Sequence, residues 1–477
     1  MKYLLCGLSI LSLTACSVDV SDPQTAGDDF TALEQVNAET PPPDQLQGVW
    51  RSRGYGWIFD IDETGITQYQ HAGEFCFEAP EISLQLTDTL ALPYQYYRLG
   101  RSPDQAILQL LPEDTEIHIE RMDDLPAHCL AETASDKSAV FEYFATLIGL
   151  HYAFFEERNI DWFARVRATR ESLNGVQSDV ELFALLSGMI DGFSDSHTKL
   201  IAVIDDELNR QQDGLGETLP AVRDQGIEMP WLIDIFTTLQ QDILDAGSQH
   251  TANDRILWGT IDDGRVGYIQ LLVMGGFSGT DIGAPEFRED EFAVFDDVMD
   301  AALTAMSGSE YVIVDLSNNR GGYDAISRRL ASRFTDEVFA AYTTQVPGSG
   351  VPARARYIEP SEGVRYTGPV VLMTSDVTVS GGEIATLSLR QLENVTHVGG
   401  ITRGSFSTVL SKPLPNGWVA ELSNEVFAAP DGSAYEEVGI APEHPFRVFP
   451  SDHLMGGHAA AIDWILQSYP FSAEPGE

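Results

Sequence analysis

Lysine is scarce in this sequence. Of 477 residues only four are lysines, and 28 Lys+Arg stand against 73 Asp+Glu, which gives a formal net charge of −45 at pH 7. A surface this acidic repels the phosphate backbone of nucleic acids, which argues against nucleic-acid binding. It is more typical of a protein that stays soluble in a salty or extracellular setting than of a cation-binding protein.

Hydrophobic runs long enough for a membrane span are also missing from the N-terminus. The apolar stretch from Tyr3 to Ala15 follows Lys2 and is shorter than the roughly 20 residues that a spanning helix needs. It ends in L-T-A-C, which resembles the bacterial lipobox, so residues 1–15 are expected to be a signal peptide and Cys16 to carry lipid. Ser17 after this cysteine implies the outer membrane, with the protein facing the periplasm. A cleaved signal peptide with an incidental cysteine is the alternative.

Cysteine is equally rare, with four in the chain. Cys6 would leave with the signal peptide and Cys16 would be lipidated, which leaves Cys76 and Cys129 as one pair. In an oxidising periplasm this pair is expected to form a disulfide. His128 is too close in sequence to Cys129 to share a tetrahedral metal site with it, and the sequence implies no metal and no organic cofactor.

Four regions follow the signal peptide. Residues 16–45 are acidic and contain prolines, and they are expected to form a flexible tether. Residues 46–130 show short alternating runs separated by turns, the pattern of a small antiparallel β domain. Residues 131–263 are expected to form a helical lead-in and cap, and residues 264–477 an α/β core.

Hydrophobic periodicity supports this division. Phe141, Phe144 and Ile148 line one face of a helix, with His151 as a packing residue, and a second helix is expected over 179–193. In the core, strands are expected at 265–273, 311–316, 369–373, 395–398 and 418–422, and helices at 291–306, 324–334, 381–392 and 457–467. This alternation predicts an α/β fold with a buried sheet.

Three short strings in these regions could carry chemistry. Ser380 lies at a predicted helix N-terminus, where free N–H groups and the helix dipole stabilise negative charge, although an N-cap serine would occupy the same place. Gly321 and Gly322 follow a buried strand, either as amide donors or as a plain turn. His197 is preceded by Ser196 at a helix exit, where a general base or a surface histidine would both fit.

Together these strings resemble one family. V-I-V-D-L-S-N-N-R-G-G, V-V-L-M-T-S-D-V-T-V-S-G-G-E-I-A and E-E-V-G-I-A-P-E resemble the tail-specific, or carboxy-terminal processing, serine peptidases, which include the core of the tricorn protease and the interphotoreceptor retinoid-binding protein. The segment ending in G-F-S-D-S-H-T resembles the helical lead-in of the tricorn-like branch. The resemblance covers residues 138–448. It implies a crotonase-like spiral α/β domain that hydrolyses peptides or proteins.

The resemblance also implies site residues. Ser380 matches the nucleophile, the amide of Gly381 one arm of an oxyanion hole, and Gly321 or Gly322 the other arm. The tricorn-like branch uses a histidine preceded by serine and an acidic residue before the G-I-x-P turn, and the matching residues form a relay in the order Glu436, Ser196, His197 and Ser380.

Several family features are absent. Many members use a lysine base 25 residues after the serine, but that position is Ser405 here. Ser317 stands where arginine is common, Glu443 stands where aspartate is usual, and no PDZ-like module is apparent between His197 and Arg265. A peptide-trimming hydrolase is therefore expected. The alternatives are an inactive lipoprotein binding module for peptides or hydrophobic ligands on the same fold, and an esterase, which the missing G-x-S-x-G motif disfavours.

Overall fold

A computed structural model of the chain describes residues 29–36, 41–86, 94–112 and 114–471. The predicted signal peptide, the predicted lipidation site Cys16 and the first part of the predicted tether lie outside these residues. Among the helices that are described, none combines the length and the apolar character needed to cross a bilayer.

The N-terminal part is an antiparallel sheet with the strand order β1-β6-β7-β8-β2-β3-β4-β5. Its strands are β1 (Glu34–Gln35), β2 (Gly48–Ser52), β3 (Trp57–Asp62), β4 (Gly65–Ala72), β5 (Phe75–Glu78), β6 (Tyr96–Leu99), β7 (Gln105–Gln109) and β8 (Ile117–Met122). The alternating sequence pattern thus folds as a β domain. β1 pairs with β6 and Val36 is buried, so the end of the segment expected as a tether belongs to this sheet.

Cys76 of β5 and Cys129 form a disulfide that closes a segment with a sequence separation of 53. Both cysteines are buried and pack with Ile58 and Tyr69 in a small hydrophobic cluster. The disulfide joins the sheet to a 3₁₀ turn, Ala127–Leu130, just before the helical region begins.

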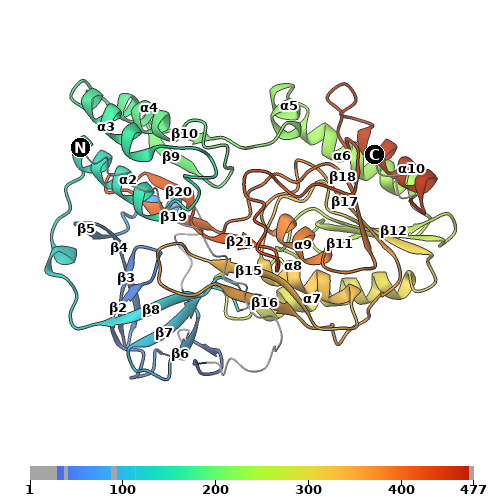
Figure 1. The fold of residues 1–477 in the computed structure, drawn as a ribbon, viewed down its shortest axis with the longest axis horizontal. Helices are drawn as coiled ribbons and strands as arrows, with labels where there is room; N and C mark the ends of the chain where they lie inside the picture. Colours follow the sequence, from blue (N-terminus) through green and yellow to red (C-terminus); the bar gives the residue numbers. More distant parts are fainter. Residues whose placement is uncertain (1–28, 37–40, 87–93, 113, 472–477) are drawn as a thin grey trace, which may run out of the picture.

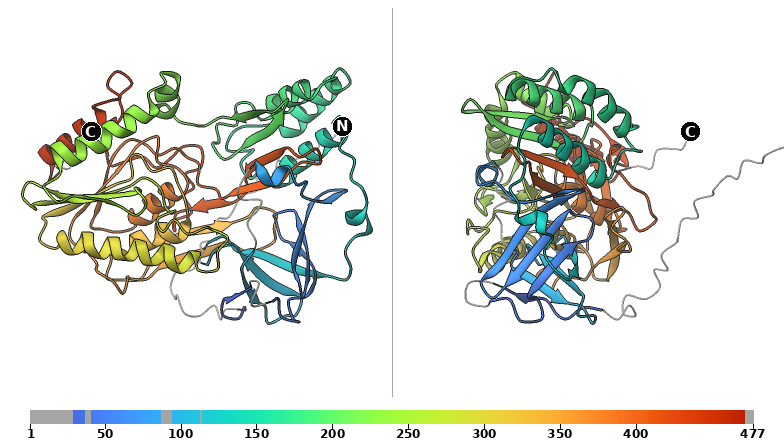
Figure 2. Two further views of the ribbon diagram at one scale, coloured as in Figure 1. Left: turned by 180° about the vertical axis from the view of Figure 1, so that it is seen from behind. Right: turned by 90° about the vertical axis from the view of Figure 1, so that its left-hand side faces the viewer.

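The helical lead-in consists of α2 (Lys137–His151), α3 (Trp162–Leu173) and α4 (Asp179–Ile190). Each helix has an N-cap side chain that accepts hydrogen bonds from backbone N–H groups of its first turn. These N-caps are Asp136, Asp161 and Ser178 respectively. Phe141, Phe144 and Ile148 are fully buried and share one core with the N-terminal sheet. The β domain and the lead-in are therefore packed as one hydrophobic unit, visible on one side of Figures 1 and 2.

A four-stranded sheet links the lead-in to the C-terminal half. Its order is β10-β9-β20-β19, with β9 (Lys199–Ile204), β10 (Glu207–Gln212), β19 (Val409–Pro413) and β20 (Val419–Ser423). β20 pairs antiparallel with β9, so segments about two hundred residues apart lie side by side. The boundary expected at residue 263 therefore does not separate two independent halves.

The α/β core is a seven-stranded sheet with the order β11-β12-β13-β14-β17-β18-β22. Its strands are β11 (Gln249–Thr251), β12 (Ile256–Ile261), β13 (Val266–Leu271), β14 (Tyr311–Asp315), β17 (Val370–Thr374), β18 (Val395–Gly399) and β22 (His444–Pro445). The pairs from β13 to β22 are parallel, as expected for buried strands between helices. β11 and β12 lie before residue 264, so the core sheet begins earlier than expected.

Helices cover both faces of this sheet. Alternate strand residues such as Val314 and Leu372 pack with α7 (Phe287–Ala305), α8 (Asp324–Ala331) and α9 (Gly381–Leu389). The intervening residues, such as Ile313 and Met373, pack with α5 (Thr218–Asp224), α6 (Glu228–Thr238) and α10 (Gly457–Ser468). Trp231 of α6 is fully buried in this second cluster, so α6 is a packing helix. A small sheet, β16 (Arg354–Ile358), β15 (Phe339–Gln345) and β21 (Val426–Ala428), completes the fold.

Candidate active site

Ser380 lies between β17 and α9, at the N-terminus of the helix. Its backbone has φ 56° and ψ −123°, a conformation that L-residues other than glycine rarely adopt. The Ser380 amide donates to the carbonyl of Ser405 at 3.0 Å, which holds this turn in place. Gly321 packs directly against Ser380, since a Cβ at Gly321 would come within 2.8 Å of the Ser380 Cβ. The half-buried serine thus lies at a sharp strand-to-helix turn, as the sequence predicts.

Two backbone amides near Ser380 are free to bind an anion. Within the described residues, the amides of Gly381 and Gly322 donate no hydrogen bond. The Gly321 amide, in contrast, donates to Asn319 Oδ1 at 3.0 Å. Gly381 and Gly322 are close neighbours, because a Cβ on Gly381 would lie 3.0 Å from the Gly322 nitrogen. Of the two glycines considered for the second arm, Gly322 is therefore the one with an available donor.

Glu383 connects the serine turn to the segment 404–405. Its carboxylate accepts from the amides of Gly404 at 2.7 Å, Ser405 at 2.9 Å and Ser380 at 3.3 Å. Burial raises the pKa of Glu383 to about 6, while these hydrogen bonds act in the opposite direction. Glu383 belongs to the S-G-G-E-I string, but the sequence analysis assigns it no role; in the structure its carboxylate supports the turn.

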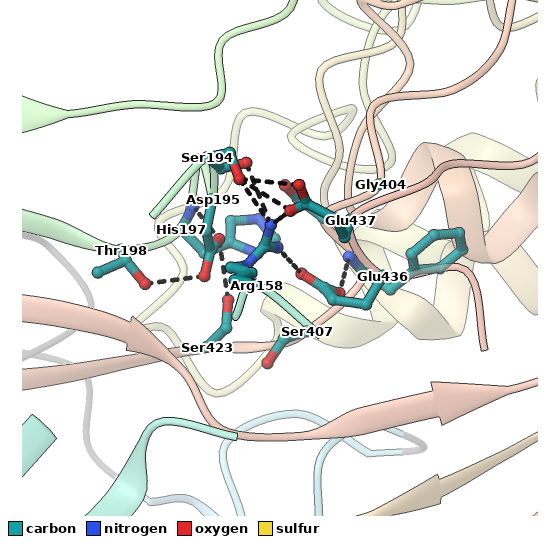
Figure 3. A network of polar contacts seen from close by, with 12 residues as sticks. Arg158, Ser194, Asp195, His197, Thr198, Gly404, Ser407, Ser423, Glu436 and Glu437 are labelled. Carbon is teal, nitrogen blue, oxygen red and sulfur yellow. Dashed lines mark hydrogen bonds and ion pairs between the residues drawn. The ribbon is translucent and has the colours of Figure 1, made fainter. Parts of the chain in front are cut away.

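His197 is held in a turn organised by Asp195. The Asp195 carboxylate is fully buried and accepts from the His197 amide at 2.9 Å, Thr198 Oγ1 at 2.8 Å and Ser423 Oγ at 3.1 Å (Figure 3). Burial lowers the pKa of His197 to about 4; Asp195 opposes this shift and Lys199 adds to it. The imidazole is therefore neutral at pH 7, the form that a general base requires.

Ser405 bridges the His197 turn and the serine turn. The Ser196 amide donates to Ser405 Oγ at 3.4 Å, and the Ser405 carbonyl accepts from the Ser380 amide. The two segments that the sequence singles out therefore meet at one residue. Within the described residues His197 and Ser380 share no hydrogen bond, and His197 Nδ1 is buried without a partner. Catalytic hydrogen bonds are often formed only once substrate is bound.

Glu436 has partners other than the expected Ser196. It accepts from Arg158 Nη2 at 2.9 Å and from the Phe406 amide at 2.9 Å, and Arg158 also pairs with Glu437 (Figure 3). Burial raises the pKa of Glu436 well above its usual range, and Arg158 opposes this shift. The hydrogen bond from Ser196 to Glu436 is not formed among the described residues; Arg158 and a backbone amide bind the carboxylate instead. No sequence motif marks Arg158, whereas Asp195 is visible in the string S-D-S-H-T.

The two lysines that could approach the serine are engaged elsewhere. Lys199 forms an ion pair with Glu421. Lys412 is fully buried and donates to the Gly56 carbonyl at 2.6 Å and to Gln70 Oε1 at 3.2 Å in the N-terminal sheet. Neither contact leads to Ser380. A lysine base is therefore not provided by the described part of the chain.

Comparisons with known proteins agree with this architecture. Residues 265–446 match the model of peptidase family S41. A protein from Parabacteroides merdae ATCC 43184, described as a candidate peptidase, is similar in structure with a TM-score of 0.54 and 21% identity, over 71% of this chain and 99% of that one. Mature CPAF gives a TM-score of 0.52 and 12% identity, over 70% of this chain and 96% of that one. A search of curated proteins finds no match. The segment that matches family S41 carries Ser380, Gly381 and the paired glycines, so the candidate nucleophile and oxyanion hole lie within the S41-like part of the chain.

Proposed function

We propose that this protein hydrolyses peptide bonds at the cell envelope through an acyl-enzyme on Ser380, with His197 as the general base. The observation that carries the proposal is the serine turn itself. A non-glycine residue at φ 56° lies against two amides that have no partner within the described chain. Such strain persists at functional sites, and amides without partners beside a serine are the donors that an oxyanion hole requires.

The chemistry follows from these positions. Ser380 Oγ attacks the carbonyl carbon of the substrate as its proton moves to the neutral His197. The amides of Gly381 and Gly322 stabilise the oxyanion, and the intermediate collapses when His197 returns the proton to the leaving amine. Water then attacks the acyl-enzyme with His197 again as the base, which releases the acid and restores Ser380.

Ser196 and Glu436 complete the proposed relay. His197 Nδ1 is buried and unpartnered within the described residues, and the adjacent Ser196 offers a hydroxyl to it. For the relay, Glu436 would in turn accept from Ser196 in addition to its present partners, since a carboxylate has acceptor sites beyond the two in use. Asp195 would act as a positioning residue, because it binds the His197 backbone rather than the ring.

A fluorophosphonate probe tests the nucleophile. We expect the full chain to be labelled, and we expect both Ser380→Ala and His197→Ala to abolish labelling and peptide hydrolysis. Ser388→Ala is a matched control, since Ser388 lies in the same helix and bonds only the Ile384 carbonyl. Unchanged hydrolysis in Ser380→Ala would overturn the proposal. Mass spectrometry of the products separates internal cleavage from carboxy-terminal trimming.

We also propose that Cys16 carries a lipid that anchors the enzyme to the outer membrane, facing the periplasm. The proposal rests on the L-T-A-C string and the serine that follows it. Metabolic labelling with radioactive palmitate should mark the wild-type protein and not Cys16→Ala. Labelling that persists in Cys16→Ala would contradict this assignment.

A binding module on the same fold is the second candidate function. The observation that favours it is that His197 and Ser380 share no hydrogen bond within the described chain. A binding module should bind a ligand and should not be labelled by a fluorophosphonate. Because Ser380 would have no chemical role in it, the wild type and Ser380→Ala should bind the ligand equally well.

A further inference from the structure

A cavity of about 110 Å³ lies where the N-terminal sheet meets the β19–β20 hairpin. Tyr55, Trp57 and Tyr94 line it from the N-terminal sheet and its loops, and Val409, Asn424 and Glu425 line it from the C-terminal half. No residue of the site described above forms its wall. We name it the aromatic cavity.

Its walls suit a flat side chain. The rings of Tyr55 and Trp57 are stacked, with centroids 5.5 Å apart and planes at 2°. Tyr94 meets Trp57 edge to face at 6.1 Å. Ile117 and Leu410 add aliphatic surface. Aromatic walls of this kind bind another ring through offset stacking and edge contacts in addition to burying its surface.

One polar side chain in the aromatic cavity lacks any partner. Asn424 is 1% exposed, yet neither its Nδ2 nor its Oδ1 forms a hydrogen bond within the described chain. A buried amide without partners is costly, so a native example needs an explanation. Because Asn424 lines a cavity, a bound group can supply the missing partner. The unpartnered Asn424 amide therefore points to a ligand independently of the shape of the cavity.

Glu425, whose pKa burial raises to about 7, disfavours acidic groups in this cavity. Glu425 accepts from Tyr55 Oη at 2.8 Å and from Thr408 Oγ1 at 3.4 Å. A carboxylate brought to this wall would face Glu425 within a chain that is strongly negative overall. A neutral group that donates a hydrogen bond, such as a hydroxyl, would be accommodated.

Lining residues of the aromatic cavity are close in sequence to residues that bind the catalytic turns. Thr408 follows Ser405, the residue that binds the Ser380 amide, by three positions. Ser423, which donates to Asp195 in the His197 turn, immediately precedes Asn424. A neighbouring cavity shares Tyr55, Thr115 and Glu425 and is lined by Asp324, two residues after Gly322.

We propose that the aromatic cavity is a specificity pocket that takes a tyrosine side chain of the peptide substrate close to the scissile bond. The ring would lie against Trp57 and Tyr55, and the hydroxyl would bind Asn424. This assignment rests on the proposed function, because it names the substrate class of that site. It ranks tyrosine above phenylalanine, and both above aliphatic and acidic side chains.

Two variants of the full chain test the pocket. Asn424→Leu keeps the volume and removes the amide, so it should abolish a tyrosine-over-phenylalanine preference of about tenfold in kcat/KM. Val409→Phe should fill the cavity and reduce cleavage of tyrosine peptides by about tenfold or more, with alanine peptides unaffected. Val203→Phe, at the exposed position of β9 in the same four-stranded sheet, is the matched control.

Binding to Ser380→Ala separates the pocket from the chemistry. Calorimetry with a tyrosine peptide and its phenylalanine and alanine analogues should reproduce the ranking in this variant, and Val409→Phe should remove it. Equal binding of all three peptides, or a ranking that survives in both pocket variants, would overturn the pocket. Absence of fluorophosphonate labelling and of turnover would instead overturn the proposed peptidase, whatever the peptides bind. If Asn424→Leu does not fold, Val409→Phe decides the outcome.

Discussion

The carbonyl oxygen of Ser405 accepts a hydrogen bond from the amide of Ser380 at 3.0 Å. Ser405 stands where many S41 peptidases carry a lysine base, and its hydroxyl accepts from the Ser196 amide instead. One residue thus ties the candidate nucleophile to the segment that carries the candidate base. We therefore expect this position to have a structural role here in place of a chemical one.

Removing the Ser405 hydroxyl should therefore impair catalysis modestly. In Ser405→Ala the carbonyl still binds Ser380, but the Ser196 amide loses its acceptor, which costs about 1 kcal/mol, or about fivefold in kcat/KM. Steady-state kinetics on a peptide substrate measure the effect. Ser388→Ala, which removes only a local bond within α9, should match the wild type. A loss of a thousandfold in Ser405→Ala would instead assign the hydroxyl a direct part in the reaction.

The pH profile should report the unusual base. Because the pKa of His197 is lowered to about 4, kcat/KM should rise through pH 4 and stay flat to pH 7. Lys199 lowers this pKa and Glu421 raises it. Lys199→Met should therefore move the acid limb towards neutral pH, and Glu421→Gln should move it further into acid. An acid limb near pH 6.5 in all three proteins would show that His197 titrates as an exposed imidazole.

Asp195 should matter for stability as well as for activity. It accepts three hydrogen bonds in a fully buried position, so Asp195→Ala leaves three donors without a partner and should lower the free energy of unfolding by about 3 kcal/mol. Urea unfolding followed by circular dichroism measures this change. Asp191→Ala, at an exposed position near the end of α4, should change it by less than about 0.5 kcal/mol. Equal stability of the two variants would contradict the role given to Asp195.

Variants of Arg158 and Glu436 distinguish a structural role of Glu436 from a catalytic one. Arg158→Met leaves the buried Glu436 without its cation and should cost about 3 kcal/mol of stability, part of which Arg158→Met/Glu436→Gln should restore. If Glu436 serves the proposed relay, Glu436→Gln should also lower kcat at least about a hundredfold under conditions where the protein is fully folded. A variant that is less stable but has normal kcat would leave Glu436 as a structural partner of Arg158.

The disulfide should stabilise the N-terminal half. A link across a sequence separation of 53 restricts the unfolded chain, and Cys76→Ser/Cys129→Ser should lower the free energy of unfolding by about 4 kcal/mol. Thermal and urea unfolding of the oxidised wild type, the reduced wild type and the double variant check this expectation. The reduced protein should resemble the double variant. Identical midpoints in all three would contradict it.

Local patterns were sufficient for much of the fold. The periodicity of Phe141, Phe144 and Ile148 predicted α2, and the apolar runs around Ile313 and Leu372 predicted buried strands. Ser380 was placed at a helix N-terminus because glycines and an apolar run flank it. These features depend on neighbours within a few residues, and they are therefore readable from sequence.

Long-range contacts were not predictable in this way. The sequence does not show that β9 pairs with β20, because the register of distant strands depends on the whole fold. The sequence also does not predict the ion pair between Arg158 and Glu436, since an arginine outside any motif has many possible partners. None of the three hydrogen bonds of the expected relay is formed within the described residues. Asp195 could have been weighed as an organiser of the His197 turn, as it lies two residues before the histidine.

The interleaved sheet β10-β9-β20-β19 has a practical consequence for dissecting this enzyme. The connection from β10 to α5 is a single chain segment that runs between the two sides of the molecule (Figure 1). A nick there would leave two pieces, each holding two strands of one sheet and one member of the Ser380 and His197 pair. Neither piece expressed alone would be active, whereas co-expression should reconstitute the enzyme, which makes this segment the natural place to build a split reporter.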